Sequence, residues 1–304
     1  MPIITKPQPL SKTVELIDIM GWKSPRTTGT LIIQGKETAI IETGNSSCSK
    51  HILSELDKRQ IPREKVRYVC VTHRHGDHCG GATPLAAELP NAAVAGHKYA
   101  IATLHDPERL NVGARQLFGN HAEDIQPLPK DASIRELQDG DALDLGAGVE
   151  VEAIGTPGHT SDHLAYLERQ SGTLYTGDAA GLFAPNHHKV SPTSFPPSFK
   201  FKSYRESLEK LQSYDPTNLV FSHFGAVTGS DVQLILKSAL TTLDAWRETI
   251  EKAWQEEQSK SAIMTAIRNR FLDEVEVFPP EARPVFIQVM ALGFAQSLYP
   301  ELKQ

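Results

Sequence analysis

The chain has 304 residues, a length that favours one large domain with an appendage, or two domains. Its net charge is −6 and it contains no run rich in lysine and arginine, which argues against a nucleic-acid-binding protein. No stretch stays apolar over the roughly 18 residues that a membrane span needs.

The compartment is inferred from the N-terminus and the cysteines. The first seven residues lack the apolar core of a secretory signal. Cys48, Cys70 and Cys79 are an odd number at irregular spacing, which fits a reducing compartment better than a disulfide framework. We therefore expect a cytoplasmic protein that acts on a small molecule, with no nucleic-acid or membrane partner.

The first half of the chain predicts antiparallel strands followed by a β-α-β unit. The predicted strands are residues 13–20, 30–34, 38–43, 66–72 and 92–96, and the predicted helices are residues 46–59, 82–89 and 97–105. Ser46 or Ser47 can cap the first of these helices. Residues 106–134 show no clean period, and so long a stretch predicts a loop over a binding site.

The second half repeats this order. Strands are predicted at residues 149–154, 163–167, 173–176 and 218–222, and a helix at residues 204–214. Residues 184–200 are rich in proline and serine and predict a loop. The phenylalanines near it, which either form an apolar wall for a substrate or pack the segment down, are Phe183, Phe195, Phe199 and Phe201.

From Ser230 onward the pattern changes to long helices. Apolar residues recur at three- and four-residue steps from Val232 to Trp254, and two shorter helical segments follow, at residues 263–271 and 284–298. Such a stripe favours core or interface over a cofactor site. We predict a catalytic domain at residues 1–229 and a helical element at residues 230–304 that either caps the pocket or forms a homodimer.

The densest group of chemically active side chains lies at residues 73–78. Three imidazoles and one carboxylate occur within these six residues, as His73, His75, Asp77 and His78. Neither a solvated loop nor an apolar core requires such a cluster, whereas a metal site does. It follows the predicted strand at residues 66–72, and α/β proteins place their chemistry at the carboxyl ends of strands.

This run resembles the His-x-His-x-Asp-His signature of the metallo-beta-lactamase superfamily. Three later segments resemble the remaining ligand loops of that family: Thr156 to Thr160 with His159, Tyr175 to Asp178, and Phe221 to Gly225 with His223. The resemblance covers roughly residues 13–228. It implies an α/β fold, an αβ/βα sandwich, here with a C-terminal helical appendage.

The resemblance also implies a dinuclear centre with seven ligands. His73, His75 and His159 would hold one ion, Asp77, His78 and His223 the second, and Asp178 would bridge them. Nitrogen and oxygen donors without thiolate suit two divalent ions, with zinc expected first and iron or manganese as alternatives. Asp77 would also act as the catalytic residue that takes a proton from the attacking water. Glu42 stands where the family usually has aspartate, and its carboxylate could orient a ligating imidazole.

The charge of such a centre indicates its chemistry. Two divalent cations, two carboxylates and a bridging hydroxide leave about +1, which favours an anionic substrate or a developing oxyanion. A metal-bound hydroxide is a nucleophile at neutral pH, so we expect hydrolysis of a carbonyl ester, thioester or lactone. The loops around His159 and Asp178 most resemble the glyoxalase II-like branch, and lactonases share the same ligands.

Other interpretations remain open. A phosphodiesterase of the same fold is disfavoured by the lack of a basic patch, and a regulatory protein with a vestigial hydrolase site would display its helical C-terminus to a partner. Flavin-coupled di-iron relatives usually carry an acidic residue at the position of His75, and β-lactamases use other residue types at the position of Asp178. We expect His163 to be structural, and His187 and His188 to be either exposed or turned toward substrate.

Overall fold

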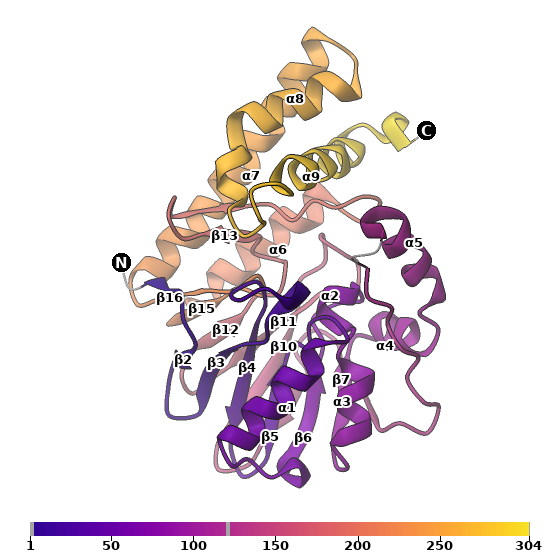
Figure 1. The fold of residues 1–304 in the computed structure, drawn as a ribbon. Coiled ribbons are helices and arrows are strands. Elements are labelled where there is room, and N and C mark those ends of the chain that lie inside the picture. The colour runs from indigo at the N-terminus through magenta and orange to yellow at the C-terminus, as the bar shows by residue number, and fades with distance from the viewer. Residues whose placement is uncertain (1–2, 120–121, 304) are drawn as a thin grey trace.

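Two β-sheets packed face to face form the centre of the protein, in a computed structural model that describes residues 3–119 and 122–303 (Figure 1). The first sheet, in spatial order, consists of β2 (Gln8–Pro9), β3 (Val14–Asp18), β4 (Gly29–Gln34), β5 (Thr38–Ile41), β6 (Val66–Cys70), β7 (Ala93–Gly96) and β8 (Ile134–Glu136). The second consists of β1 (Ile3–Ile4), β16 (Ala226–Thr228), β15 (Asn218–Val220), β12 (Thr173–Tyr175), β11 (Leu164–Glu168), β10 (Glu150–Gly155) and β9 (Ala142–Asp144). A separate hairpin pairs β13 (Leu182–Ala184) with β14 (Lys189–Ser191).

Helices cover the outer faces of both sheets. They are α1 (Cys48–Lys58), α2 (Gly76–Cys79), α3 (Ala82–Glu88), α4 (Lys98–His105), α5 (Glu108–Phe118), α6 (Phe201–Ser213), α7 (Asp231–Glu256), α8 (Lys260–Phe271) and α9 (Arg283–Leu298). Short 3-10 turns are η1 (Gly21–Lys23), η2 (Arg63–Lys65), η4 (Leu272–Val275) and η5 (Pro300–Lys303). The predicted αβ/βα sandwich with C-terminal helices is therefore confirmed.

The alternation of apolar residues along the strands explains the layers. On β3, Leu16 points into the core between the sheets while Ile17 packs under the helices on the outer face. Strands β5, β6, β7 and β8 run parallel to one another, so their carboxyl ends meet at one edge of the sheet. The histidine-rich loop begins at that edge, directly after β6.

The structure corrects three details of the sequence analysis. Residues 106–134 are not all loop, because α5 lies within them; among its residues 108–116 only Asn111 is buried. Residues 184–200 are not all loop either, because β14 lies within them. Neither Ser46 nor Ser47 caps α1: Ser46 donates to main-chain carbonyls, including that of Asp124, and Ser47 donates to Glu123.

The C-terminal helices share one hydrophobic core with the second sheet. The stripe of α7 is buried from Val232 to Ile250, against α6, α8 and α9. The stripe is therefore covered within the chain, so it gives no reason of its own for a homodimer, which stays a prediction. Among the described residues, no helix is both long and apolar enough to cross a membrane.

We expect Trp246→Ala to destabilise the fold strongly. Trp246 is fully buried and its ring packs on Phe271 and Phe294, which come from α8 and α9. Its removal leaves a cavity that costs about 3–5 kcal/mol in the free energy of unfolding. Urea unfolding measures this. Leu234→Ala on the same helix is the control, since Leu234 is 56% exposed and should change stability by about 0.5 kcal/mol or less. Equal midpoints for the two variants would contradict the role of Trp246.

Candidate metal centre

Four loops meet at one end of the sandwich, and each of them follows a strand. They continue from β6, β10, β12 and β15, and β12 and β15 are parallel neighbours whose carboxyl ends coincide. The main-chain carbonyl of Thr72 accepts a hydrogen bond from the N–H of Leu164 at 2.8 Å, which joins the loop after β6 to strand β11 of the second sheet. All seven residues predicted as ligands lie on these loops or on the short helix α2.

Three imidazoles form a first group. The ring nitrogens His73 Nε2, His75 Nδ1 and His159 Nε2 lie 2.9–3.1 Å from one another. His159 Nδ1 donates to the carbonyl of Thr193 at 2.6 Å, so its Nε2 carries a free lone pair. Burial lowers the pKa of His75 to about 3 and that of His73 well below its ordinary value, so these rings are neutral at pH 7. A tetrahedral ion with bonds of about 2.0–2.1 Å separates its ligands by about 3.3 Å, close to this spacing.

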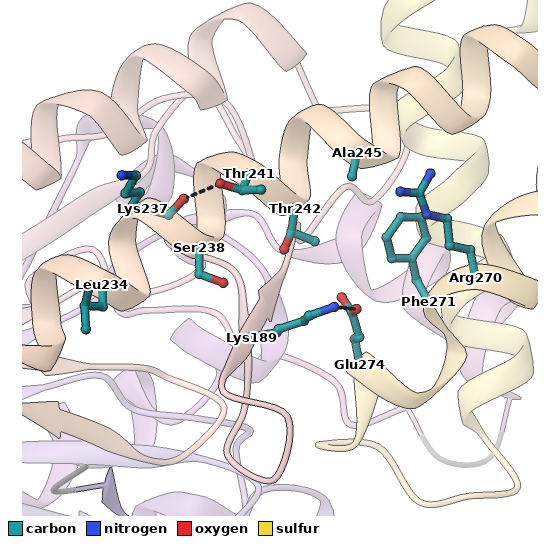
Figure 2. Close-up of a pocket in the computed structure, with 10 residues that line it drawn as sticks. All are labelled: Lys189, Leu234, Lys237, Ser238, Thr241, Thr242, Ala245, Arg270, Phe271 and Glu274. Atoms are coloured by element: carbon teal, nitrogen blue, oxygen red, sulfur yellow. Dashed lines mark hydrogen bonds and ion pairs between the residues drawn. The ribbon is translucent and has the colours of Figure 1, made fainter.

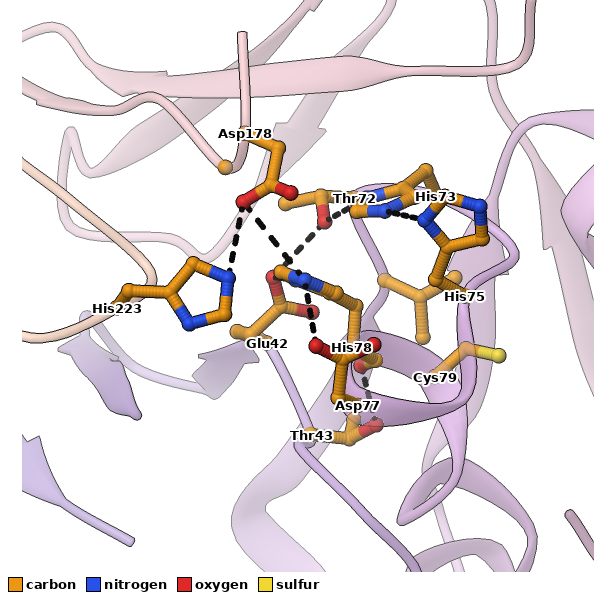
Figure 3. Close-up of polar contacts among 12 residues, drawn as sticks. Glu42, Thr43, Thr72, His73, His75, Asp77, His78, Cys79, Asp178 and His223 are labelled. Atoms are coloured by element: carbon orange, nitrogen blue, oxygen red, sulfur yellow. Dashed lines mark hydrogen bonds and ion pairs between the residues drawn. The ribbon is translucent and has the colours of Figure 1, made fainter. Parts of the chain in front are cut away.

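A second group consists of Asp77, His78 and His223, with Asp178 beside it (Figure 3). His78 Nε2 lies 3.5 Å from Asp77 Oδ2 and 3.7 Å from Asp178 Oδ1, and His223 Nε2 lies 3.4 Å from Asp178 Oδ1. The other oxygen of Asp178, Oδ2, lies 3.3 Å from His159 Nε2 in the first group. Asp178 thus turns one oxygen toward each group, as a bridging carboxylate would.

The charges around His78 fit a cation. Burial by itself would lower the pKa of His78, but the carboxylates of Asp77, Asp178 and Glu42 raise it well above its ordinary value. Oδ1 of Asp178 and Oε1 of Glu42 are buried and accept no hydrogen bond of good geometry. Buried oxygens without partners are costly unless a cation or a donor lies beside them. The donor set of nitrogen and carboxylate oxygen therefore fits divalent metal ions.

Glu42 orients His78. Its Oε2 accepts a hydrogen bond from His78 Nδ1 at 2.8 Å and another from the Thr72 hydroxyl at 2.8 Å. The residue is fully buried and has φ of 82°, a conformation that side-chain-bearing residues rarely adopt. Burial raises the pKa of Glu42, whereas its contact with His78 opposes that rise. The carboxylate fixes the imidazole with Nε2 toward the second group, which is the role that the sequence left open for Glu42.

Three further histidines were discussed in the sequence analysis, and the structure places each of them. His163 is structural, as predicted: its Nδ1 donates to the hydroxyl of Thr156 at 2.8 Å and its Nε2 accepts from the N–H of Asp178 at 3.0 Å. It thereby holds the loop that carries Asp178. His187 and His188 are exposed on the β13–β14 turn and do not line the pocket above the metal centre.

A pocket of about 260 Å³ lies over the two groups. Its walls come from α5, from the segment around Phe195, and from Phe278, Phe286 and Val289 near and on α9. Of the four phenylalanines considered from sequence, only Phe195 lines the pocket. The others pack the segment down: Phe183 and Phe199 are buried in the core, and Phe201 packs against Phe294 of α9.

Trp22, Phe278 and Phe286 line the pocket although sequence reasoning did not select them. The Trp22 ring stacks on His223 with centroids 5.8 Å apart. It reaches this position from η1, where Trp22 has φ of 49°. The spacing of apolar residues along the sequence does not predict that Trp22 lies beside His223. The pairing of Phe278 with Phe286 likewise depends on how α9 docks.

Comparison with known proteins finds hydrolases among the relatives. A hydroxyacylglutathione hydrolase from Rhodopseudomonas palustris is 28% identical over 189 residues, which are 62% of this chain and 60% of that protein. An atrochrysone carboxyl ACP thioesterase from Emericella nidulans is 25% identical over 181 residues, 59% of this chain and 48% of that protein. The chain spans about half the length of the curated relatives that it matches.

The fold and the family agree. A crystal structure of a metallo-beta-lactamase family protein from Thermus thermophilus superposes with a TM-score of 0.63 at 22% identity, covering 98% of this chain and 93% of that one. The likeness of fold therefore extends through the C-terminal helices. The sequence model of the metallo-beta-lactamase superfamily matches residues 26–223, which is more than half of the chain. The chain therefore belongs to the metallo-beta-lactamase superfamily.

Proposed function

We propose that the protein is a dinuclear metal-dependent hydrolase that cleaves a carbonyl ester, thioester or lactone. The observation that supports this most directly is the meeting of two donor groups at Asp178, at the foot of a pocket with apolar walls. His73, His75 and His159 would hold one ion, and Asp77, His78 and His223 the other. Zinc is the ion we propose, since it accepts imidazole and carboxylate ligands in tetrahedral geometry.

The reaction needs a nucleophilic water, a polarised carbonyl and a proton acceptor. Divalent ions at these positions supply Lewis acidity and lower the pKa of water. Asp77 lies at the pocket floor with a quarter of its side chain exposed. Burial would raise the pKa of Asp77, but His78 and the other nearby imidazoles lower it below its usual range. An ionised Asp77 can accept a proton from water that attacks a bound carbonyl.

The pocket favours carbonyl substrates over phosphodiesters. Among the described residues that line it, Arg74 is the one lysine or arginine, and its Nε lies 3.4 Å from the buried carboxylate of Asp162. Phosphoryl transfer depends on several cationic groups around the phosphate. The names of the two curated relatives, a hydrolase of an acylglutathione and a thioesterase, support the same substrate class.

The first test of this function is metal content. We expect the purified protein to bind about two zinc ions per chain, measured by elemental analysis after dialysis against zinc and then against metal-free buffer. His75→Ala removes one of the three converging nitrogens, so it should lose about one ion and nearly all activity. His105→Ala is the control, since His105 Nδ1 faces the carbonyl of Leu128 outside the centre. A native protein with only traces of metal would exclude the dinuclear proposal.

The second test is substrate class. A panel of thioesters, lactones, carboxylic esters and phosphodiesters should show carbonyl cleavage with kcat/KM at least about 100-fold above phosphodiester cleavage, since no cationic clamp for phosphate lines the pocket. A chelator should abolish the activity and zinc should restore it. A preference for a phosphodiester over every carbonyl substrate would overturn the assignment. A protein that binds metal but cleaves no substrate would favour a regulatory role.

The third test concerns Glu42. Glu42→Gln keeps the size of the side chain but removes the charge that holds His78, so the affinity for zinc should fall by about 10- to 100-fold. Competition with a colorimetric chelator measures the affinity. Glu37→Gln is the control, because Glu37 is half-exposed on the turn between β4 and β5. An unchanged affinity in Glu42→Gln would show that Glu42 has no part in orienting His78.

A further inference from the structure

Aromatic rings cross the pocket from one histidine group to the other. Phe195 lies edge-on to His159 at 6.4 Å between centroids, and Phe286 lies edge-on to Phe195 at 6.2 Å. Phe278 stacks on Phe286 at 3.9 Å and lies 6.3 Å from His223. All three phenylalanines line the pocket. We call Phe195, Phe286 and Phe278 the aromatic arch, because they connect His159 of the first group with His223 of the second.

Contacts within the chain hold both ends of the arch. Beside Phe195, the hydroxyl of Ser194 donates to the main-chain carbonyl of Met290 on α9 at 2.9 Å. Near Phe278, Glu274 of η4 pairs with Lys189 of β14 at 2.6 Å, a contact that Figure 2 shows. Glu276 accepts a hydrogen bond of 2.7 Å from the side chain of Asn186. These contacts hold the rings in position, and a preformed site loses less free energy on binding.

The pocket wall opposite the aromatic arch also carries apolar side chains. Leu110 and Ala114 of α5 and Ile125 line it. The side-chain amide of Asn111 bonds both main-chain groups of Ile125, at 2.9 and 3.0 Å. Glu123 likewise accepts two hydrogen bonds from Ser47, at 2.9 and 2.8 Å. Asn111 and Glu123 of this wall thus already have partners, and Leu110, Ala114 and Ile125 supply its apolar surface.

The volume of the pocket limits the size of the acyl group that it can hold. The cavity of about 260 Å³ lies just below the range of roughly 300–1,000 Å³ typical of ligand pockets. A cavity of roughly 150 Å³ is enough for benzene, so this pocket has room for one aromatic ring together with the linker of the acyl group. An acetyl group leaves most of it unfilled, and a linear alkyl chain has no ring to meet the ring edges and faces that the arch presents, whereas aromatic pairs prefer edge-to-face and offset-stacked arrangements.

We propose that the pocket selects substrates with a compact aromatic acyl group, of which phenylacetyl is the simplest example, and that Phe286 and Phe278 determine this specificity. The inference rests on the proposed function, because the acyl carbonyl must reach the metal centre while the ring lies under the arch. A substrate of this kind would come from a reaction that joins an aryl carboxylic acid to a thiol or an alcohol.

The experiment compares acyl groups on one small leaving group. Phenylacetyl, acetyl and decanoyl thioesters of N-acetylcysteamine are offered to the full-length, zinc-loaded protein, and the released thiol is measured. We expect kcat/KM for the phenylacetyl thioester to exceed the other two by about tenfold or more, as differences in filling an apolar pocket do. Phe286→Ala should lose about tenfold on the phenylacetyl thioester, chiefly through KM, and change the acetyl thioester less than about twofold.

Val285→Ala is the matched control. Val285 precedes Phe286 on α9, is 62% exposed and does not line the pocket, so neither substrate should respond to its replacement. Phe286→Leu accompanies the alanine variant, because it keeps most of the apolar volume and should fold if the alanine variant does not. Circular dichroism and zinc content verify that each variant is intact. The leucine variant should still lose part of the preference for the phenylacetyl thioester.

A binding measurement separates this inference from the proposed function. Calorimetry should show that phenylacetate binds the zinc-loaded protein about tenfold or more tightly than acetate does, and that Phe286→Leu removes this difference. If no thioester, ester or lactone is cleaved, the proposed function fails, while this binding difference still supports an aryl pocket. If thioesters are cleaved but acyl groups are not distinguished, or Phe286 variants leave the preference unchanged, the inference is overturned and the hydrolase stands.

Discussion

Three carboxylates surround one imidazole in the interior of this protein, and much of the structure follows from that concentration of negative charge. Glu42, Asp77 and Asp178 lie around His78, and the full burial of Glu42 and Asp178 makes their charges costly without a cation nearby. The sandwich delivers them from separate strand ends, so none can move away without disturbing a sheet. A centre that accepts positive charge is the arrangement in which these groups are stable together. A cation that balances these charges would also supply the proposed chemistry.

The sequence predicted the layered fold and the position of the site for identifiable reasons. Period-two alternation located the strands, and His73, His159, Asp178 and His223 follow predicted strands. That these residues converge was implied by the resemblance to the metallo-beta-lactamase superfamily, and the structure brings them together. Metal ligands can also be recognised by residue type. A cluster of histidines and aspartate has few roles other than metal binding, so the short pattern at residues 73–78 was enough to locate the site.

The walls of the pocket could not be predicted in the same way. Whether a phenylalanine faces a ligand or a core depends on helix docking, which has no local signature. Phe195 and Phe199 are four residues apart, yet one lines the pocket and the other is buried behind it. Helix α5 also escaped prediction: among its residues 108–116 only Asn111 is buried, and Leu110 and Ala114 line the pocket. The apolar patterns in the sequence therefore predicted the strands and most of the helices, but not the residues that line the pocket.

The segment at residues 193–195 gives α9 a role in the centre itself. The carbonyl of Thr193 holds His159, its hydroxyl donates to the carbonyl of Asp178 at 2.6 Å, and Ser194 binds α9. A side chain at Gly293 would collide with the carbonyl of Ser194, so α9 lies directly against this segment. Swinging α9 outward would pull on the imidazole and the carboxylate at once. The C-terminal helices therefore support the loops that carry His159 and Asp178 as well as covering the second sheet.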